Sequence, residues 1–189
     1  MRNKFFALVI AFVFICPLTF AQNNNEEEKG IEAEVYAGYG TPSLIPVVAS
    51  VLSAIGGALT GADEVEGDMT GVVHAGVNFY PFSWLGLGGY ASYEGFKMTF
   101  DDKPASMINI ITLQARVTLQ YGFERVKFYH GANGGAAFVN GPENYKPSQM
   151  FGFTPIGIKF RPGDNIQFYI ETGLISNAFF SAGVSYKFN

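Results

Sequence analysis

The sequence predicts an all-β protein, an eight-stranded antiparallel up-and-down β-barrel that spans a membrane. Three observations indicate this fold: apolar residues recur at every second position in eight stretches, charged residues make up only 15% of the chain, and short and long connections alternate along it. Alternation with a period of two is typical of a strand with one apolar and one polar face. A soluble β-sandwich also alternates, but so few charges favour a barrel whose outer face contacts lipid.

The beginning of the chain predicts export. Residues 1–21 combine a basic start, an apolar stretch and a small residue at the end, which is the pattern of a Sec-type secretory signal peptide. The only cysteine, Cys16, lies in this stretch, so the mature chain has no thiol for a disulfide, a metal or catalysis. Lipid attachment at Cys16 is an alternative that the preceding residues match poorly. Residues 22–30 have no apolar side chain and are expected to form a flexible leader, which leaves 31–189 for the barrel.

Four strands are expected in the first part of the barrel, at 31–40, 70–80, 84–98 and 111–121. In the last of these, six apolar residues from Ile111 to Tyr121 occupy every odd position and polar residues occupy the even ones. No soluble amphipathic helix keeps this period.

Four further strands are expected at 126–139, 149–161, 165–174 and 180–188. Within 149–161, Phe151 and Phe153 have the opposite parity to Ile156, which predicts a β-bulge near Thr154 and Pro155. His130 falls on the apolar face of its strand and weakens the register there. The last strand alternates throughout, and its expected partner is the first strand, 31–40.

The connections are sorted by length. Those around Pro81, Phe123 and Gly163 are short, whereas 41–69, 99–105 and 141–148 are longer. Outer-membrane barrels have short periplasmic turns and longer external loops. We therefore expect a protein of the bacterial outer membrane with both termini on the periplasmic side.

The chain resembles the small outer-membrane β-barrel proteins of Gram-negative bacteria, also called the porin family. The resemblance rests on the signal peptide, the hairpin at 78–90 and the final strand. The resemblance identifies Ser181, Gly183, Tyr186 and Phe188 as the insertion signal that the barrel-assembly machinery reads, with the departure that Asn189 follows the last aromatic residue. It implies fold and location, and almost nothing about activity, because this fold hosts many functions.

The barrel interior is predicted to contain mixed charges, because an eight-stranded barrel is just wide enough for side chains to fill it. By parity, the inward charged residues are Glu32, Glu34, Glu94, Arg116, Lys127, Lys159, Arg161, Glu171 and Lys187. Buried charges are expected to form ion pairs, since an unpaired charge away from water is costly; a gated ion path is the alternative. Lys187 should lie near Glu32 or Glu34, and Tyr169 should cover Gly183.

The sequence contains few residue patterns that would indicate catalysis or cofactor binding. His74 and Ser92 point inward on neighbouring strands, which is the minimum for nucleophilic catalysis. His130 points outward, with Val117 as its expected neighbour, so no serine is available there. No cluster has metal-ligand spacing, so no metal, cofactor or enzymatic activity is expected. The net charge of −4 gives no basic surface for nucleic acid.

The first long connection is unusually apolar. Its candidate binding residues are Leu44, Ile45, Val48, Leu52, Ile55 and Leu59. Ser43 could cap a short helix that ends at Gly56 and Gly57, which would be too short to cross a bilayer. We expect 44–59 to fold over the barrel mouth. The alternatives are that it lies in the outer leaflet, binds an external protein, or binds a small apolar ligand.

These observations together predict a monomeric, non-enzymatic protein embedded in outer-membrane lipid, with a structural or surface-interaction role through its external loops. One alternative is a carrier for a small apolar molecule that uses 44–59. A second is a lipid-modifying enzyme built around His74 and Ser92.

Overall fold

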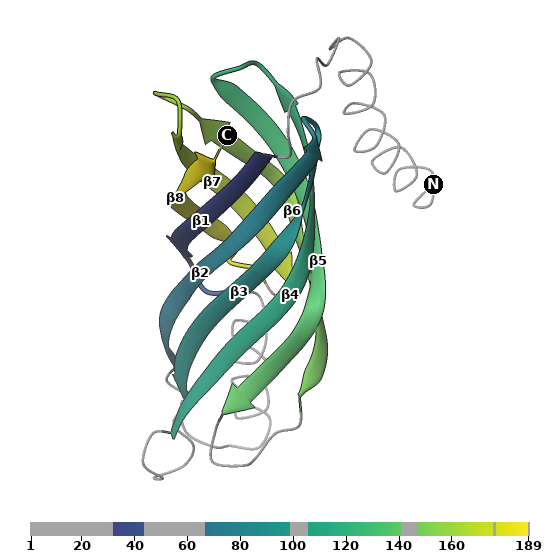
Figure 1. Ribbon diagram of the computed structural model, residues 1–189. Coiled ribbons are helices and arrows are strands. Elements are labelled where there is room, and N and C mark those ends of the chain that lie inside the picture. The colour runs from purple at the N-terminus through teal and green to yellow at the C-terminus, as the bar shows by residue number, and fades with distance from the viewer. Residues whose placement is uncertain (1–31, 44–66, 99–105, 141–146, 176, 189) are drawn as a thin grey trace, which may run out of the picture.

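A computed structural model describes residues 32–43, 67–98, 106–140, 147–175 and 177–188, which form one closed antiparallel barrel (Figure 1). The strands are β1 Glu32–Gly40, β2 Gly67–Phe82, β3 Leu85–Met98, β4 Ser106–Gly122, β5 Val126–Asn140, β6 Ser148–Phe160, β7 Ile166–Ile175 and β8 Phe180–Phe188. The predicted fold class is confirmed. The predicted signal peptide, the leader and the possible helix in 44–59 lie outside the described residues.

The barrel closes between its first and last strands. β1 pairs with β8 from Ala33 opposite Phe188 to Gly40 opposite Ser181. Every other strand pairs with its neighbours in sequence, as expected for an up-and-down barrel. The predicted closing partner of the last strand is therefore correct.

The two faces of the barrel wall are inverted relative to those of a water-soluble protein. Outward Leu113 is 54% exposed, and many large apolar side chains share its face, whereas inward Glu34 is only 2% exposed. In water this arrangement would expose the apolar surface and bury the charges. Around a lipid-facing barrel the same pattern is stable, because the outer face contacts hydrocarbon. The structure is that of a transmembrane β-barrel.

Aromatic pairs surround the rim that carries the short connections, which is the upper rim in Figure 1. The ring centroids of Phe82 and Trp84 lie 5.8 Å apart, and those of Tyr186 and Phe188 lie 4.8 Å apart. Tyr121 also stacks on a neighbouring phenylalanine. Aromatic girdles of this kind flank the apolar band of membrane barrels, at the boundary between hydrocarbon and water.

The wall is taller on one side of the barrel. β2 to β6 contain 13 to 17 residues each, whereas β1, β7 and β8 contain 9 or 10. At the rim with the longer connections, β1 ends with Gly40 opposite Val72, although β2 begins at Gly67. We call the extended part of β2 to β6 the tall wall; it reaches towards the lower end of Figure 1.

Two strands begin earlier than the alternation predicted. β2 begins at Gly67 rather than at 70, and β4 begins at Ser106 rather than at 111. In the added part of β4, inward Ile110 is buried next to outward Ile111. Because both faces are apolar there, the period-two signal disappears although the strand continues.

The predicted β-bulge is present in β6. The pairing of β6 with β7 shifts between Phe153 and Ile156, and the pairing of β5 with β6 shifts between Tyr129 and Gly131. The extra residue explains why apolar residues change parity along β6.

His130 lies beside this bulge, on the outer face of β5. It pairs with Leu119, so the expected neighbour Val117 was wrong. Its Nδ1 is hydrogen-bonded to the carbonyl oxygen of Pro155, and its Nε2 lies 3.1 Å from the hydroxyl of Tyr121. A polar side chain is stable on this apolar face because its ring nitrogens have partners and Tyr121 stacks over it.

Candidate functional site: the polar network in the barrel interior

Three ion pairs form among the nine charged residues predicted to face inward. Arg116 pairs with Glu171 at 2.7 Å, Lys159 with Glu34 at 2.6 Å, and Lys187 with Glu32 at 2.5 Å. The first two pairs are almost fully buried, whereas the third lies partly exposed at the rim with the short connections. The interior is therefore held together by paired charges.

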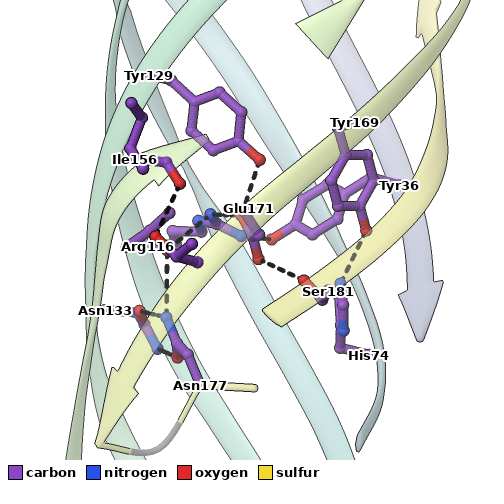
Figure 2. A network of polar contacts seen from close by, with 12 residues as sticks. Tyr36, His74, Arg116, Tyr129, Asn133, Ile156, Tyr169, Glu171, Asn177 and Ser181 are labelled. Carbon is purple, nitrogen blue, oxygen red and sulfur yellow. Dashed lines mark hydrogen bonds and ion pairs between the residues drawn. The ribbon is translucent and has the colours of Figure 1, made fainter. Parts of the chain in front are cut away.

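The pair of Arg116 and Glu171 is buried in the barrel interior, where polar side chains from several strands surround it (Figure 2). The hydroxyl of Tyr129 donates a hydrogen bond to Glu171 Oε2 at 2.8 Å, and that of Ser181 donates to Oε1 at 3.4 Å. Arg116 also donates to the hydroxyl of Tyr36 at 3.3 Å. Additional hydrogen bonds offset the desolvation of a buried ion pair, and these three come from three different strands.

The second buried pair has a similar arrangement. Lys159 Nζ donates to both carboxylate oxygens of Glu34, at 2.8 and 2.6 Å, and to the hydroxyl of Tyr80 at 2.9 Å. That hydroxyl in turn donates to Glu34. Three groups thus share a closed set of hydrogen bonds, and the tyrosine orients both charges.

Tyr129 connects the two pairs. Its ring lies 6.0 Å from the Arg116 guanidinium and 5.2 Å from Lys159 Nζ, within the range of cation–π attraction. The ring of Tyr36 also lies 5.5 Å from Arg116. Aromatic rings fill the space between the charges, so the two pairs and their tyrosines form a single packed unit, which we call the lumen network.

The lumen network leaves only a very small cavity. Both ion pairs line a void of about 10 Å³, together with Asn78, Thr118 and several tyrosines. This is about the volume that one water molecule needs. Side chains therefore fill the barrel at this level, as expected for eight strands.

A second polar layer lies closer to the rim with the longer connections. Asn133 and Asn177 exchange reciprocal hydrogen bonds of 2.9 and 3.0 Å, and Asn177 also donates to Thr154 at 3.3 Å (Figure 2). The sequence analysis missed Asn177, because a residue between two strands is expected to face water. Ile175, at the end of β7, has a φ of 67°, which is unusual for a β-branched residue. The chain changes direction there, and the side chain of Asn177 is buried inside the barrel.

Glu94, Lys127 and Arg161 differ from the other predicted charges. Glu94 accepts hydrogen bonds from the backbone N–H and the hydroxyl of Ser43, at 2.7 and 2.8 Å, and no ion pair is found for it among the described residues. Lys127 lies opposite Lys159 on the inner face. Arg161 lies just beyond the end of β6, where its backbone N–H donates to Arg125. The structure does not bring these three residues together.

His74 and Ser92 lie on paired strands, but their side chains are hydrogen-bonded to other residues. They are directly opposite each other in the register of β2 and β3. However, His74 Nε2 is hydrogen-bonded to the hydroxyl of Tyr169 at 2.8 Å, and Ser92 Oγ to that of Thr112 at 2.6 Å. A serine nucleophile is activated by a hydrogen bond to its base, and the structure gives the Ser92 hydroxyl Thr112 as its partner in place of His74. Both side chains instead belong to the packed interior.

The comparisons with known proteins find similarity in structure only. No family model matches the sequence, and no curated protein matches it. Three solved structures with a similar arrangement are a de novo designed transmembrane β-barrel (15% identity, TM-score 0.46), the attachment invasion locus protein Ail of Yersinia pestis (11%, 0.49) and Neisserial surface protein A (11%, 0.47). Each similarity covers 85–86% of this chain and all of the other chain. Ail was solved in complex with the heparin analogue sucrose octasulfate. At these sequence identities, the ligand of a similar protein is a property of that protein alone.

The proposed insertion signal is divided between the two faces of β8. Ser181 and Gly183 face inward, and Tyr169 lies over Gly183, as predicted. Tyr186 and Phe188 face outward at the rim with the short connections. The six candidate binding residues from Leu44 to Leu59 lie outside the described residues.

The described part of the chain has no grouping of three or more His, Cys, Asp or Glu side chains suited to a metal ion. It also contains no helix long and apolar enough to cross a membrane. What the site can do chemically is hold charges in fixed pairs, because each carboxylate in the two buried pairs has its cation and at least one tyrosine hydroxyl as partners.

Proposed function

We propose that this protein is a non-enzymatic, integral protein of the bacterial outer membrane, with a non-conducting interior and a structural or surface-interaction role. The observation that carries the proposal is the lumen network, in which Arg116, Glu171, Lys159 and Glu34 are paired across the barrel with about 10 Å³ left between them. A filled interior leaves the wall, and the loops at one rim, as the parts that meet other molecules.

The proposed location is supported by the sorting of connections and of aromatic residues. Short connections join β2 to β3, β4 to β5 and β6 to β7, all at the rim where the aromatic pairs gather. In bacterial outer-membrane barrels such turns are periplasmic. We therefore assign this rim, with Glu32 and Phe188, to the periplasmic side, and the tall wall to the external side.

The proposed insertion signal belongs to the same assignment. Ser181, Gly183, Tyr186 and Phe188 match the signal of the family that the chain resembles, and the two aromatic residues lie outward at the proposed periplasmic rim. In that position the assembly machinery can bind them before the barrel closes. A separate prediction below tests this role.

Conductance tests the non-conducting interior. The purified protein in a planar lipid bilayer should give no current above that of the bare bilayer, because neither buried pair leaves a path for a hydrated ion. A variant carrying both Arg116→Ala and Glu171→Ala removes both side chains of this ion pair, so it should give measurable current. Open channels in the unaltered protein, at a voltage that the bilayer tolerates, would contradict the proposal.

A second candidate function is the binding of a small apolar molecule. The observation in its favour is an apolar cluster on the inner face of the tall wall, formed by Phe96, Ile110 and Ala137. A carrier, however, needs a surface that its ligand can reach, and these three side chains are buried. Titration with a fluorescent fatty acid tests the candidate, since saturable binding that Phe96→Asp abolishes would favour it over the first proposal.

A further inference from the structure

The inner face of the barrel changes character at the external rim. At and before the level of Glu94 the inner face is polar, but beyond Glu94 a group of inward apolar residues occupies the tall wall, with serines only at its edge. Phe96 lies opposite Ile108, and Ile110 lies opposite Val139. The residues that share this surface are Phe96, Ile110 and Ala137, with Met69, Ile108, Val139 and Met150 packed against them. We call this set the inner apolar surface.

The strands across the barrel do not extend far enough to cover the inner apolar surface. β7 ends at Ile175, opposite Gly152, and β1 ends at Gly40, opposite Val72. Even so, Phe96, Ile110 and Ala137 are only 6%, 5% and 0% exposed. An apolar sheet face at an aqueous rim has to be covered, and here the described strands supply only part of the cover.

We propose that the inner apolar surface is the docking surface for residues 44–59 of the same chain. Three connections start and end at this rim outside the described residues, at 44–66, 99–105 and 141–146. The second contains two aspartates and a lysine, and the third contains a glutamate and a lysine. Only 44–59 has a long apolar stretch without any charge. Composition therefore selects it as the segment that gains most from leaving water.

The ends of the connection point to the same place. Ser43 is 1% exposed, and its backbone N–H and hydroxyl both donate to Glu94. Glu94 is paired with Ile110 and precedes Phe96 by two positions on the same face. The chain thus leaves the described residues inside the barrel, next to the inner apolar surface, and returns at Gly67 on the tall wall, opposite Met98.

Thiol labelling of the full-length protein in lipid nanodiscs tests the proposal. Phe96→Cys should react with a water-soluble maleimide at least about tenfold more slowly than Phe123→Cys, which replaces an exposed side chain in a turn, because a buried thiol reacts only after local opening. Replacing residues 48–55 with glycine and serine should bring the Phe96→Cys rate to within about twofold of the control. The same replacement in 141–146 should leave the Phe96→Cys rate unchanged.

A cross-link gives a second, independent measurement that leaves the segment almost unaltered. Phe96→Cys should form a disulfide with a cysteine at one of Val48, Leu52 or Ile55. Met107→Cys serves as the matched control, because Met107 lies on the outer face of the neighbouring strand and should form none with the same three positions.

Three results would overturn the proposal: rapid labelling of Phe96→Cys in the otherwise unaltered chain, slow labelling that persists after 48–55 is replaced, or no disulfide from any of the three positions. Slow labelling that persists together with co-purified lipid would assign the surface to a lipid. Heat-modifiable gel migration of every variant shows whether the barrel has formed, and therefore separates these results from a failure of the fold.

Discussion

Arg116 of β4 and Glu171 of β7 form an ion pair across the barrel interior, with 2.7 Å between Nη2 and Oε2. β5 and β6 separate the two strands in the wall, so the pair joins segments that share no backbone hydrogen bond. Both side chains are buried, and Tyr129 and Ser181 add hydrogen bonds to the carboxylate. The contact therefore links directly two strands that the wall connects only through β5 and β6.

Removing one partner of this pair should be much more damaging than removing both. Arg116→Met leaves Glu171 buried without a cation, and we expect it to lower the free energy of unfolding by about 3–5 kcal/mol. Arg116→Met combined with Glu171→Gln leaves no uncompensated charge and should recover most of that loss. Denaturant unfolding of the protein in lipid vesicles measures both variants. Equal losses in Arg116→Met and the double variant would show that the unpaired charge of Glu171 is not the cause of the loss.

The two lysine pairs should differ in the same assay. Side-chain exposures in the pair of Lys159 and Glu34 are 7% and 2%, against 10% and 21% in the pair of Lys187 and Glu32. Lys159→Met leaves the buried carboxylate of Glu34 without its cation and should lower the free energy of unfolding by several kcal/mol. Lys187→Met should lower it by about 1 kcal/mol or less, because water solvates Glu32. A larger loss for Lys187→Met than for Lys159→Met would contradict this ranking.

Gly183 should not tolerate a side chain. A Cβ atom at this position would overlap the backbone carbonyl oxygen of Ala37 on β1, and it would lie 2.5 Å from Cζ of Tyr169, closer than a real contact allows. Gly183→Ala should therefore lower the free energy of unfolding by about 1–3 kcal/mol, because both the ring of Tyr169 and the backbone of β1 must shift. Gly89→Ala is the matched control, because a Cβ there meets no atom within 4 Å. If the two variants unfold at the same denaturant concentration, neither Tyr169 nor the β1 backbone packs as closely on Gly183 as the structure shows.

A charge on the outer face tests the membrane placement. Leu113→Arg places a guanidinium in the middle of the apolar belt, and we expect a loss of about 2–4 kcal/mol in lipid vesicles. Phe123→Arg, in a turn at the proposed periplasmic rim, should have an effect near zero, because its side chain is already 76% exposed beyond the belt. If Leu113→Arg leaves the free energy of unfolding unchanged, this part of the wall contacts water and not lipid.

The insertion signal predicts a defect in cells without a defect in the fold. Phe188→Ala should reduce the amount of heat-modifiable barrel in the outer membrane several-fold, while refolding of the purified variant into detergent stays unchanged. Phe180→Ala, which removes an outward aromatic ring from the other end of the same strand, is the matched control. Loss of refolding in Phe188→Ala would show a structural role instead of a signal.

Most of the barrel could be predicted from sequence because its two faces contact different surroundings. Lipid outside and packed charges inside impose alternation, so parity predicts which side chains face inward and the bulge near Pro155. Parity does not fix the register: Val117 was the expected neighbour of His130, whereas the structure pairs His130 with Leu119. Where both faces are apolar, as around Ile110 and Ile111, parity carries no information. The predicted start of β4 was too late for that reason.

The interior was harder to predict than the wall. Parity shows which charges face inward, but the pairing of Arg116 with Glu171 depends on the diameter and shear of the closed barrel. Sequence separation offers no signal for a contact across 55 positions. Asn177 was missed for a related reason, because local composition predicts a solvated turn and only the closed barrel gives it Asn133 as a partner.

The pairing of β1 with β8 has a consequence for synthesis and for truncation. β1 acquires its second neighbour only when the last nine residues of the barrel are available, and until then both β1 and β7 have an open hydrogen-bonding edge. A chain that lacks only Phe180–Phe188 therefore loses two strand ladders at once. It also removes Lys187 and Ser181, which lie opposite Glu34 and Glu171 in the strand register, so two carboxylates of the interior lose their β8 neighbours together with the ladders.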